Sequence, residues 1–106
     1  MYAPIYLRTE NELNKILKRQ KKTRQEMGLL FVSLWDPHSK TLMKEVKNSL
    51  TTDSHYAKPL YIVDSFTMPH AFVIFKTTKL PHLVQFRKGS LLSEDYLTKI
   101  YKDLGL

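Results

Sequence analysis

The order of apolar and polar positions along the chain changes repeatedly between a strand-like and a helix-like pattern. Residues 28–35 (GLLFVSLW) and 59–65 (PLYIVDS) are short runs with few polar side chains, which is typical of strands covered on both faces, as in a parallel sheet. In the segments between and after these runs, apolar residues recur three and four positions apart, which is the spacing of helices that lie on a sheet. Helices and strands are therefore predicted to alternate.

The first strand and the first helix are predicted at the start of the chain. Residues 4–8 (PIYLR) have the pattern of a short strand, and Thr9 follows as the expected N-cap of a helix. Glu12 stands three residues after Thr9, which completes the pattern of a capping box. The inward-facing stripe of this helix is predicted to consist of Leu13, Ile16 and Leu17.

Two further helices are predicted in the middle of the chain. The second ends at about Leu50 and is followed by a loop over residues 51–58 (TTDSHYAK). The third is a short helix within residues 67–77, because Pro69 suits a first helical turn; one long strand through residues 71–75 (AFVIF) is the alternative. The inward-facing residues of the second helix are predicted to be Leu42, Met43, Val46 and Leu50.

The C-terminal part is predicted to form a hairpin and a last helix. Residues 81–86 (PHLVQF) alternate, residues 87–90 (RKGS) turn, and residues 90–92 (SLL) return, which indicates a hairpin with one face in solvent. Ser93 is expected to begin the last helix, with Glu94 and Asp95 in its first turn, where the helix dipole favours acids, and Gly105 at its end. Its buried face is predicted to be Tyr96, Leu97, Ile100, Tyr101 and Leu104.

These elements predict an α/β fold with the order β-α-β-α-β-α-β-β-α. Strands that alternate with helices imply right-handed crossovers, and the hairpin adds antiparallel strands to the same sheet. A chain of 106 residues is long enough for one modest core and too short for two. We therefore predict a single domain, residues 1–106, built as a three-layer sandwich around a mixed central sheet with a C-terminal antiparallel hairpin.

This order, three short motifs and the spacing of two prolines make the chain resemble the thioredoxin-like fold family from about Pro4 to Leu104. The active-site motif of that family is Trp-Cys-x-x-Cys-Lys, and residues 35–40 (WDPHSK) have the same frame. Residues 63–69 (VDSFTMP) are similar to the Val-Asp-x-x-x-x-Pro loop of the family, and residues 81–89 (PHLVQFRKG) to its Pro-Thr-x-x-x-Phe-x-x-Gly segment. The number of residues between Pro69 and Pro81 also matches the spacing of the two corresponding prolines in the family. The resemblance implies that the Leu80–Pro81 peptide bond is cis.

The chain departs from the family at the residues that carry redox chemistry. It contains no cysteine, and Asp36 and Ser39 stand where the two active-site cysteines would be. The family's buried aspartate corresponds to Leu30, and a nearby lysine to about Ile62. Without a thiol there is no disulfide exchange, no thiolate nucleophile and no thiolate metal site. We therefore predict a redox-inactive protein that is not an enzyme.

Two interpretations of Asp36 remain open. It can be a purely structural N-cap, with Pro37 at the first helical position, where no N–H is lost. Alternatively the groove has been kept without the reaction, since the resemblance implies that the residue before the cis-proline, Leu80, offers its backbone to an extended peptide. The partner-binding surface would then consist of Trp35, Asp36, Pro37, His38, Leu80 and Pro81.

Other site chemistry has little support. His38, His70 and His82 could approach one another in this fold, with Asp36 nearby, but none forms a close pair with metal-ligand spacing. Ser39 and His38 are adjacent, yet no third group is available to orient the imidazole. We predict no metal site, no catalytic residue and no small-molecule cofactor.

Positive charge is concentrated in residues 15–24 (KILKRQKKTR), within a net charge of +7. This run is either a solvated helix face or a contact surface for nucleic acid or an acidic partner. No aromatic residue is interleaved there, so base stacking is not indicated. The side chains opposite the apolar stripe are Lys15, Lys18, Arg19 and Lys22.

The sequence thus predicts a non-catalytic, thioredoxin-like binding or adaptor protein whose partner is a macromolecule, most simply a protein. A nucleic-acid-associated accessory protein that acts through the basic helix is the alternative, and an unrecognised enzyme that works at His38 is a third. No apolar run is long enough to span a membrane, and the first ten residues lack the layout of a signal peptide. We expect a cytoplasmic protein without membrane contact.

Overall fold

The computed structural model describes residues 4–49, 58–87, 90–96 and 98–104. The elements follow the predicted order β-α-β-α-β-α-β-β-α. None of the helices in these ranges is long and apolar enough to cross a membrane. The elements are β1 Ile5–Tyr6, α1 Glu10–Thr23, β2 Met27–Val32, α2 Pro37–Ser49, β3 Leu60–Asp64, α3 Pro69–Ile74, β4 His82–Arg87, β5 Ser90–Tyr96 and α4 Thr98–Asp103.

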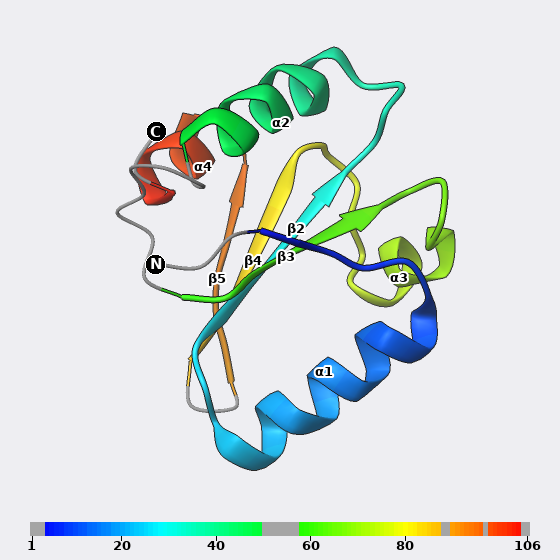
Figure 1. Cartoon of the computed structure of the whole chain (residues 1–106), viewed down its shortest axis with the longest axis vertical. Helices are drawn as coiled ribbons and strands as arrows, with labels where there is room; N and C mark the ends of the chain where they lie inside the picture. Colours follow the sequence, from blue (N-terminus) through cyan, green and yellow to red (C-terminus); the bar gives the residue numbers. More distant parts are fainter. Residues whose placement is uncertain (1–3, 50–57, 88–89, 97, 105–106) are drawn as a thin grey trace.

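The strands form one mixed sheet in the order β1-β3-β2-β4-β5. The pairs β1–β3 and β3–β2 are parallel, whereas β2–β4 and β4–β5 are antiparallel. Helices α2 and α4 cover one face, and α1 and α3 cover the other (Figure 1). The predicted three-layer α/β sandwich with a C-terminal hairpin is confirmed.

Each face of the sheet has its own hydrophobic core, and β2 contributes to both. Leu30 and Val32 belong to the cluster beneath α2 and α4, whereas Leu29 and Phe31 belong to the cluster beneath α1 and α3. All six residues of β2 are buried. A central strand with a core on both sides has no position for a polar side chain, which explains the continuous apolar run in the sequence.

The first helix begins as predicted. The backbone N–H of Glu12 donates to Oγ1 of Thr9 at 3.2 Å, and the Glu12 carboxylate accepts from the backbone N–H of Arg8 at 3.2 Å. The carboxylate therefore returns to the residue before the cap, one position earlier than in a standard capping box. The predicted apolar stripe is confirmed: Leu13 is buried, and Ile16 and Leu17 pack against the same cluster.

The predictions for α2 and α3 also hold where the structure describes them. Leu42 and Val46 of α2 are fully buried and Met43 is partly buried, whereas Leu50 and the predicted loop up to residue 57 lie outside the described residues. Residues 69–74 are helical with Pro69 in the first turn. The alternative of a strand through this segment is wrong.

The prediction of a strand over residues 28–35 is wrong at its end. The strand stops at Val32, and Leu34 and Trp35 are 61% and 84% exposed. The backbone N–H of Asp36 donates to the carbonyl of Ser33 at 3.1 Å, which closes a turn directly after the strand. The apolar residues in this turn leave the core and reach the surface.

Two predictions for the hairpin and the last helix are also wrong. Strand β4 has no solvent face from His82 to Gln85, because helices cover both sides of it. Residues 93–96 do not begin the last helix; they continue β5, where Tyr96 pairs with His82 across the hairpin. Helix α4 begins at Thr98, and Leu97 and Gly105 lie outside the described residues. Ile100 and Leu104 are buried as predicted.

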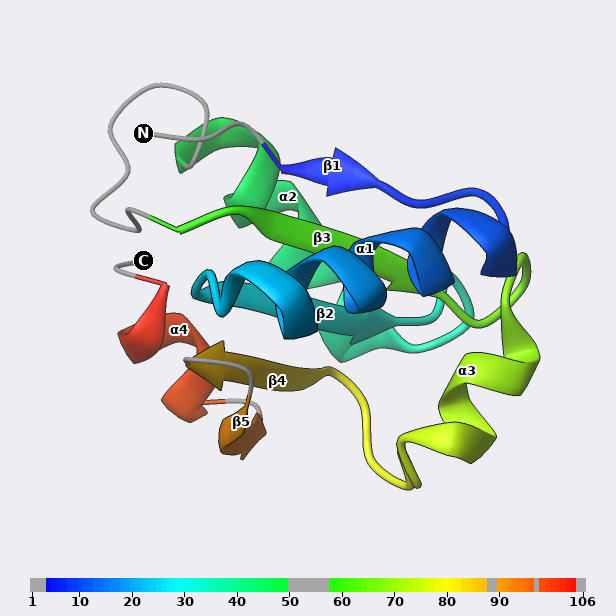
Figure 2. The same ribbon diagram turned by 90° about the horizontal axis from the view of Figure 1, so that it is seen from below.

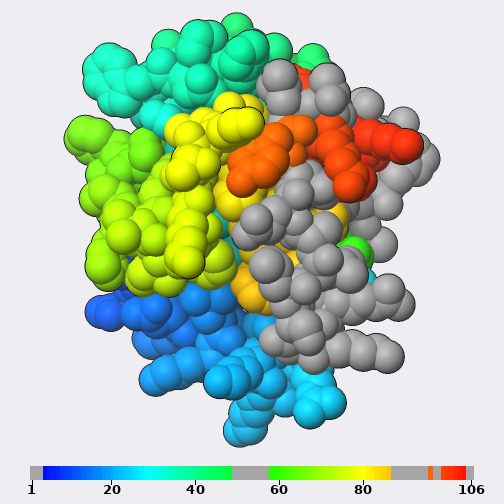
Figure 3. Space-filling view, turned by 180° about the vertical axis from the view of Figure 1, so that it is seen from behind, coloured from blue at the N-terminus to red at the C-terminus, as the bar shows by residue number. Residues whose placement is uncertain are grey.

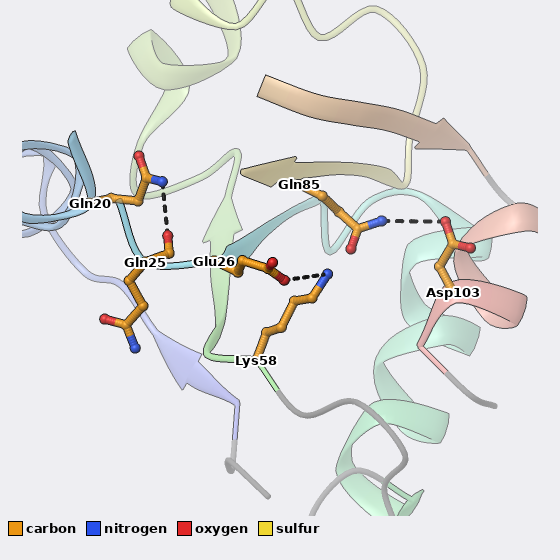
Figure 4. A network of polar contacts seen from close by, with 6 residues as sticks. All are labelled: Gln20, Gln25, Glu26, Lys58, Gln85 and Asp103. Atoms are coloured by element: carbon orange, nitrogen blue, oxygen red, sulfur yellow. Dashed lines mark hydrogen bonds and ion pairs between the residues drawn. The ribbon is translucent and has the colours of Figure 1, made fainter. Parts of the chain in front are cut away.

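Polar contacts fix the ends of several elements (Figure 4). The side-chain amide of Gln20 in α1 donates to the carbonyl of Gln25 at 2.8 Å, which ties the helix end to the turn before β2. Lys58 forms an ion pair with Glu26 at 3.2 Å. A longer contact, at 3.5 Å, joins Gln85 of β4 to Asp103 of α4.

Candidate functional site

The residues in the two cysteine positions of the thioredoxin motif bind each other. Oδ2 of Asp36 accepts hydrogen bonds from the backbone N–H of Ser39 at 2.8 Å and from the Ser39 hydroxyl at 2.9 Å. Asp36 is thus the N-cap of α2, and Pro37 occupies the first position of the helix. The Ser39 side chain is 1% exposed. Its hydroxyl is therefore a structural donor without access to a substrate.

The positions that would support redox chemistry have become part of the core. Leu30 and Ile62 are 0% and 1% exposed, and both belong to the cluster beneath α2 and α4. These apolar side chains provide no proton acceptor or donor near the start of α2. At this end of the sheet, apolar packing and a helix cap thus occupy the positions of the family's redox groups.

The most exposed large apolar side chain among the described residues is that of Trp35, at 84%. It borders an open pocket of about 440 Å³ whose other lining residues are Leu34, Lys40 and Phe66. No carboxylate is among these lining residues. The pocket lies where β2 and β3 end, because Leu34 follows β2 and Phe66 follows β3.

The loop that presents Phe66 is held by backbone and side-chain hydrogen bonds. The N–H of Phe66 donates to Oδ1 of Asp64 at 3.2 Å, and the N–H of Met68 donates to the carbonyl of Asp64 at 3.0 Å. The N–H of Ser65 donates to the carbonyl of Val32 at 3.0 Å, which links the loop to the end of β2. Phe66 is 75% exposed despite this fixed backbone. Phe66 was not among the predicted site residues. The signal that could have identified it is a large aromatic residue in the short connection between a predicted strand and Pro69.

A second hollow of about 120 Å³ adjoins the first, because Leu34 lines both. It lies between the edge of the sheet and α2, and Tyr6 of β1 and Met43 of α2 contribute to it. Tyr6 is 46% exposed, and the partial burial of its phenol raises the pKa of that group from its ordinary value. The two hollows give an apolar surface that extends from Trp35 toward β1.

The Leu80–Pro81 peptide bond is cis, as the resemblance implied. The pairing of β2 with β4 ends at Phe31 and His82. Leu80 and Pro81 directly precede His82 in the chain and therefore lie just beyond this end of the paired strands. Figure 3 shows the segment before β4, in yellow, below the N-terminal part of α2. These residues therefore lie at the same end of the sheet as Trp35.

The six predicted partner-binding residues differ in their solvent exposure. Trp35, Pro37 and His38 are exposed, and Asp36 is half-buried with its carboxylate engaged in the cap. Leu80 is half-buried against the core beneath α1 and α3, and Pro81 is buried. The pocket beside Trp35 is lined on another side by Phe66, and neither Leu80 nor Pro81 is among its lining residues.

The histidines do not assemble into a site. His38 and His70 are exposed, whereas His82 is fully buried, with its ring stacked on Tyr96 at a centroid distance of 4.6 Å. Nδ1 of His82 lies 2.9 Å from Oγ1 of Thr77. Over the part of the chain that the structure describes, no three His, Cys, Asp or Glu side chains are placed to hold a metal ion.

Comparisons with known proteins identify the fold. No family model matches the chain, and no curated protein matches it. Among solved structures, thioredoxin O2 from Arabidopsis thaliana is similar at a TM-score of 0.75 and 16% identity, over 96% of this chain and 94% of that one. Thioredoxin O1 from the same plant gives 0.76 and 14%, over 97% and 98%. A Schistosoma mansoni thioredoxin gives 0.73 and 16%, over 98% and 97%.

These likenesses establish a thioredoxin-like fold over almost the whole chain. Because the chain has no cysteine, its own residues provide no thiol for disulfide exchange. The chain thus combines a thioredoxin-like fold with a sequence that contains no cysteine.

Proposed function

We propose that this chain is a non-catalytic binding protein that recognises an extended segment of a protein partner through the surface around Trp35. The observation that carries the proposal is the 84% exposure of Trp35 beside an open apolar pocket. Tryptophan has a large apolar surface and is enriched among the residues that dominate binding energy at protein interfaces. A partner that covers Trp35 in the complex would explain why the free chain keeps this apolar side chain at the surface.

The neighbours of Trp35 support a binding role over a catalytic one. The carboxylate of Asp36 is engaged by two hydrogen bonds from Ser39, so it contributes to the helix start and has little freedom for proton transfer. Leu34 and Phe66 are also exposed and line the same pocket. Apolar side chains that gather at the surface in this way mark interaction sites.

Each predicted partner-binding residue has a role in this proposal. Trp35, Pro37 and His38 supply exposed side chains, and Asp36 holds them in place through the cap. Leu80 and Pro81 act through the backbone, since an extended segment can pair with the residue before the cis-proline by strand addition. The pocket lined by Leu34 and Phe66 then receives an apolar side chain of the bound segment.

The test uses a random-peptide library panned against the immobilised protein. Enriched peptides are synthesised, and their affinities for the wild type, Trp35→Ser and Phe66→Ser are measured by isothermal titration calorimetry. Val73→Ser is the matched control, because Val73 is 70% exposed on α3 and lines none of the hollows beside Trp35.

We expect the Trp35 and Phe66 variants to bind at least about tenfold more weakly, as for residues at the centre of an interface, and Val73→Ser to bind as the wild type does. Peptides that bind all four proteins equally, or a library that yields no peptide, would overturn the proposal.

A further inference from the structure

A second surface, the basic stripe of α1, is not used by the proposed function. The stripe consists of Lys15, Lys18, Arg19 and Lys22, which are all exposed. Leu13 is 3% exposed on the opposite side of the helix, where it packs into the core. Figure 2 shows α1 lying over the sheet with its outer side covered by no other described element.

The cations of the stripe repel one another. Lys15 lies three and four residues from Lys18 and Arg19, and Lys22 lies four and three residues from the same two residues. Side chains at these separations are neighbours on a helix, and like charges there are destabilising. The favourable end of the helix dipole helps Lys22 in the last turn but falls off before Lys15 and Lys18.

The acids nearest the stripe form contacts with other groups. The carboxylate of Glu12 is occupied at the start of the helix by the N–H of Arg8 and the hydroxyl of Thr9. Glu26, just after the helix, forms an ion pair with Lys58 at 3.2 Å (Figure 4). Within the described residues, none of the four cations of the stripe forms an ion pair. These four exposed cations are therefore available for contact with an external polyanion.

The spacing and surroundings of the stripe favour one class of polyanion. Lys15 and Lys22 are seven residues apart, which is a rise of about 10.5 Å along the helix. A nucleic-acid duplex carries about six phosphate charges over that length, so every cation of the stripe can be neutralised at once. Insertion into a membrane would need the apolar side of α1, and that side is buried against the sheet.

The stripe has no means of reading bases. Helix α1 (ENELNKILKRQKKT) contains no aromatic residue on which a base could stack. Its side chains offer charge-assisted contacts, and the guanidinium of Arg19 can bind a phosphate through two hydrogen bonds. We propose that the basic stripe binds the phosphate backbone of a nucleic acid, independently of base sequence and of the peptide site at Trp35.

The experiment is a fluorescence anisotropy titration of the full chain with labelled duplex DNA and duplex RNA over a series of salt concentrations. Four released counterions predict a slope of log K against log salt of about −3.6 for a duplex. In the stripe variant, Lys15, Lys18, Arg19 and Lys22 are changed to Gln, which preserves helix propensity. The matched control changes Lys44, Lys76, Lys79 and Lys102 to Gln. These four lysines are exposed outside α1, on α2, on α4 and in the connection between α3 and β4, and their replacement lowers the net charge by the same amount.

We expect the stripe variant to lose at least about tenfold in affinity at low salt and most of the salt slope, while the control retains both. Circular dichroism establishes that each variant is folded. Absence of duplex binding by the wild type, or an equal loss in the control, would overturn the proposal.

Three further arms identify the partner. If poly-glutamate binds as tightly as the duplexes, the stripe is assigned to an acidic protein instead. If vesicles that contain phosphatidylserine bind as tightly, it is assigned to a lipid surface. Duplexes of scrambled sequence should bind equally, and a strong preference among them would contradict a backbone contact.

Discussion

The most informative perturbation is the replacement of Asp36 by alanine, because this residue stands where thioredoxins have a reactive cysteine. Removal of an N-cap side chain costs about 0.5–2 kcal/mol. Ser39 is 1% exposed, and its hydroxyl donates to the same carboxylate oxygen at 2.9 Å. A hydrogen bond to a charged group contributes about 1.5–3 kcal/mol. Since both contacts share one oxygen, we expect Asp36→Ala to lower the free energy of unfolding by about 2–3 kcal/mol.

Urea unfolding followed by circular dichroism measures this loss, and thermal unfolding should show a melting temperature lower by roughly 10–20 °C. Two variants separate the contributions. Asp36→Asn retains an oxygen that can cap the helix, so it should lose less than Asp36→Ala. Ser39→Ala removes only the hydroxyl and keeps the bond from the backbone N–H, so it should cost about 1.5–2 kcal/mol, less than Asp36→Ala. If Asp36→Ala unfolded within about 0.5 kcal/mol of the wild type, the helix start would not depend on this pair.

Two other perturbations address the core and the edge of the candidate site. Leu30→Asp, which restores the family's buried acid, should lower the free energy of unfolding by more than about 3 kcal/mol, because it removes a fully buried leucine and buries a polar group. Urea unfolding against Leu30→Ala checks this, and a smaller loss than that of Leu30→Ala would contradict it. Partial burial raises the pKa of the Tyr6 phenol, so folding slightly favours the protonated form. This stabilisation is complete below about pH 10 and is lost as the pH rises through the folded-state pKa. Urea unfolding at about pH 9 and pH 11 should therefore show a larger loss for the wild type than for Tyr6→Phe, and equal losses would refute it.

The proposed sites are expected to act independently, because they lie on different parts of the molecule. Helix α1 covers the face of the sheet opposite to α2, and Trp35 precedes α2 (Figure 1). The stripe variant should therefore bind the selected peptides as the wild type does, and Trp35→Ser should retain the affinity for duplexes.

Local patterns were sufficient to predict most of the fold. The cap at Thr9 and the buried stripe of α1 follow from residues within one or two turns of each other. The cis bond before Pro81 was implied by the resemblance to the thioredoxin-like fold family and not by a local pattern. The helix at Pro69 was predicted because proline suits the first turn.

The errors arose where contacts distant in sequence decide the structure. Ser93, Glu94 and Asp95 have the composition of a helix start, yet pairing with β4 keeps them in a strand. Hydrophobicity gave no means to distinguish Trp35, which is exposed, from Phe31, which is buried. For the same reason Phe66 was not included in the candidate site. It is brought beside Trp35 only by the parallel pairing of β2 and β3.

Collisional quenching of Trp35 fluorescence by acrylamide tests the binding role of this surface most directly, since Trp35 is the only tryptophan of the chain. The measurement compares the free protein with the protein saturated by a selected peptide that contains no tryptophan. Strong quenching in the free protein and clear protection in the complex are the expected results. A peptide that binds tightly while Trp35 remains as accessible as before would show that the partner occupies a different surface.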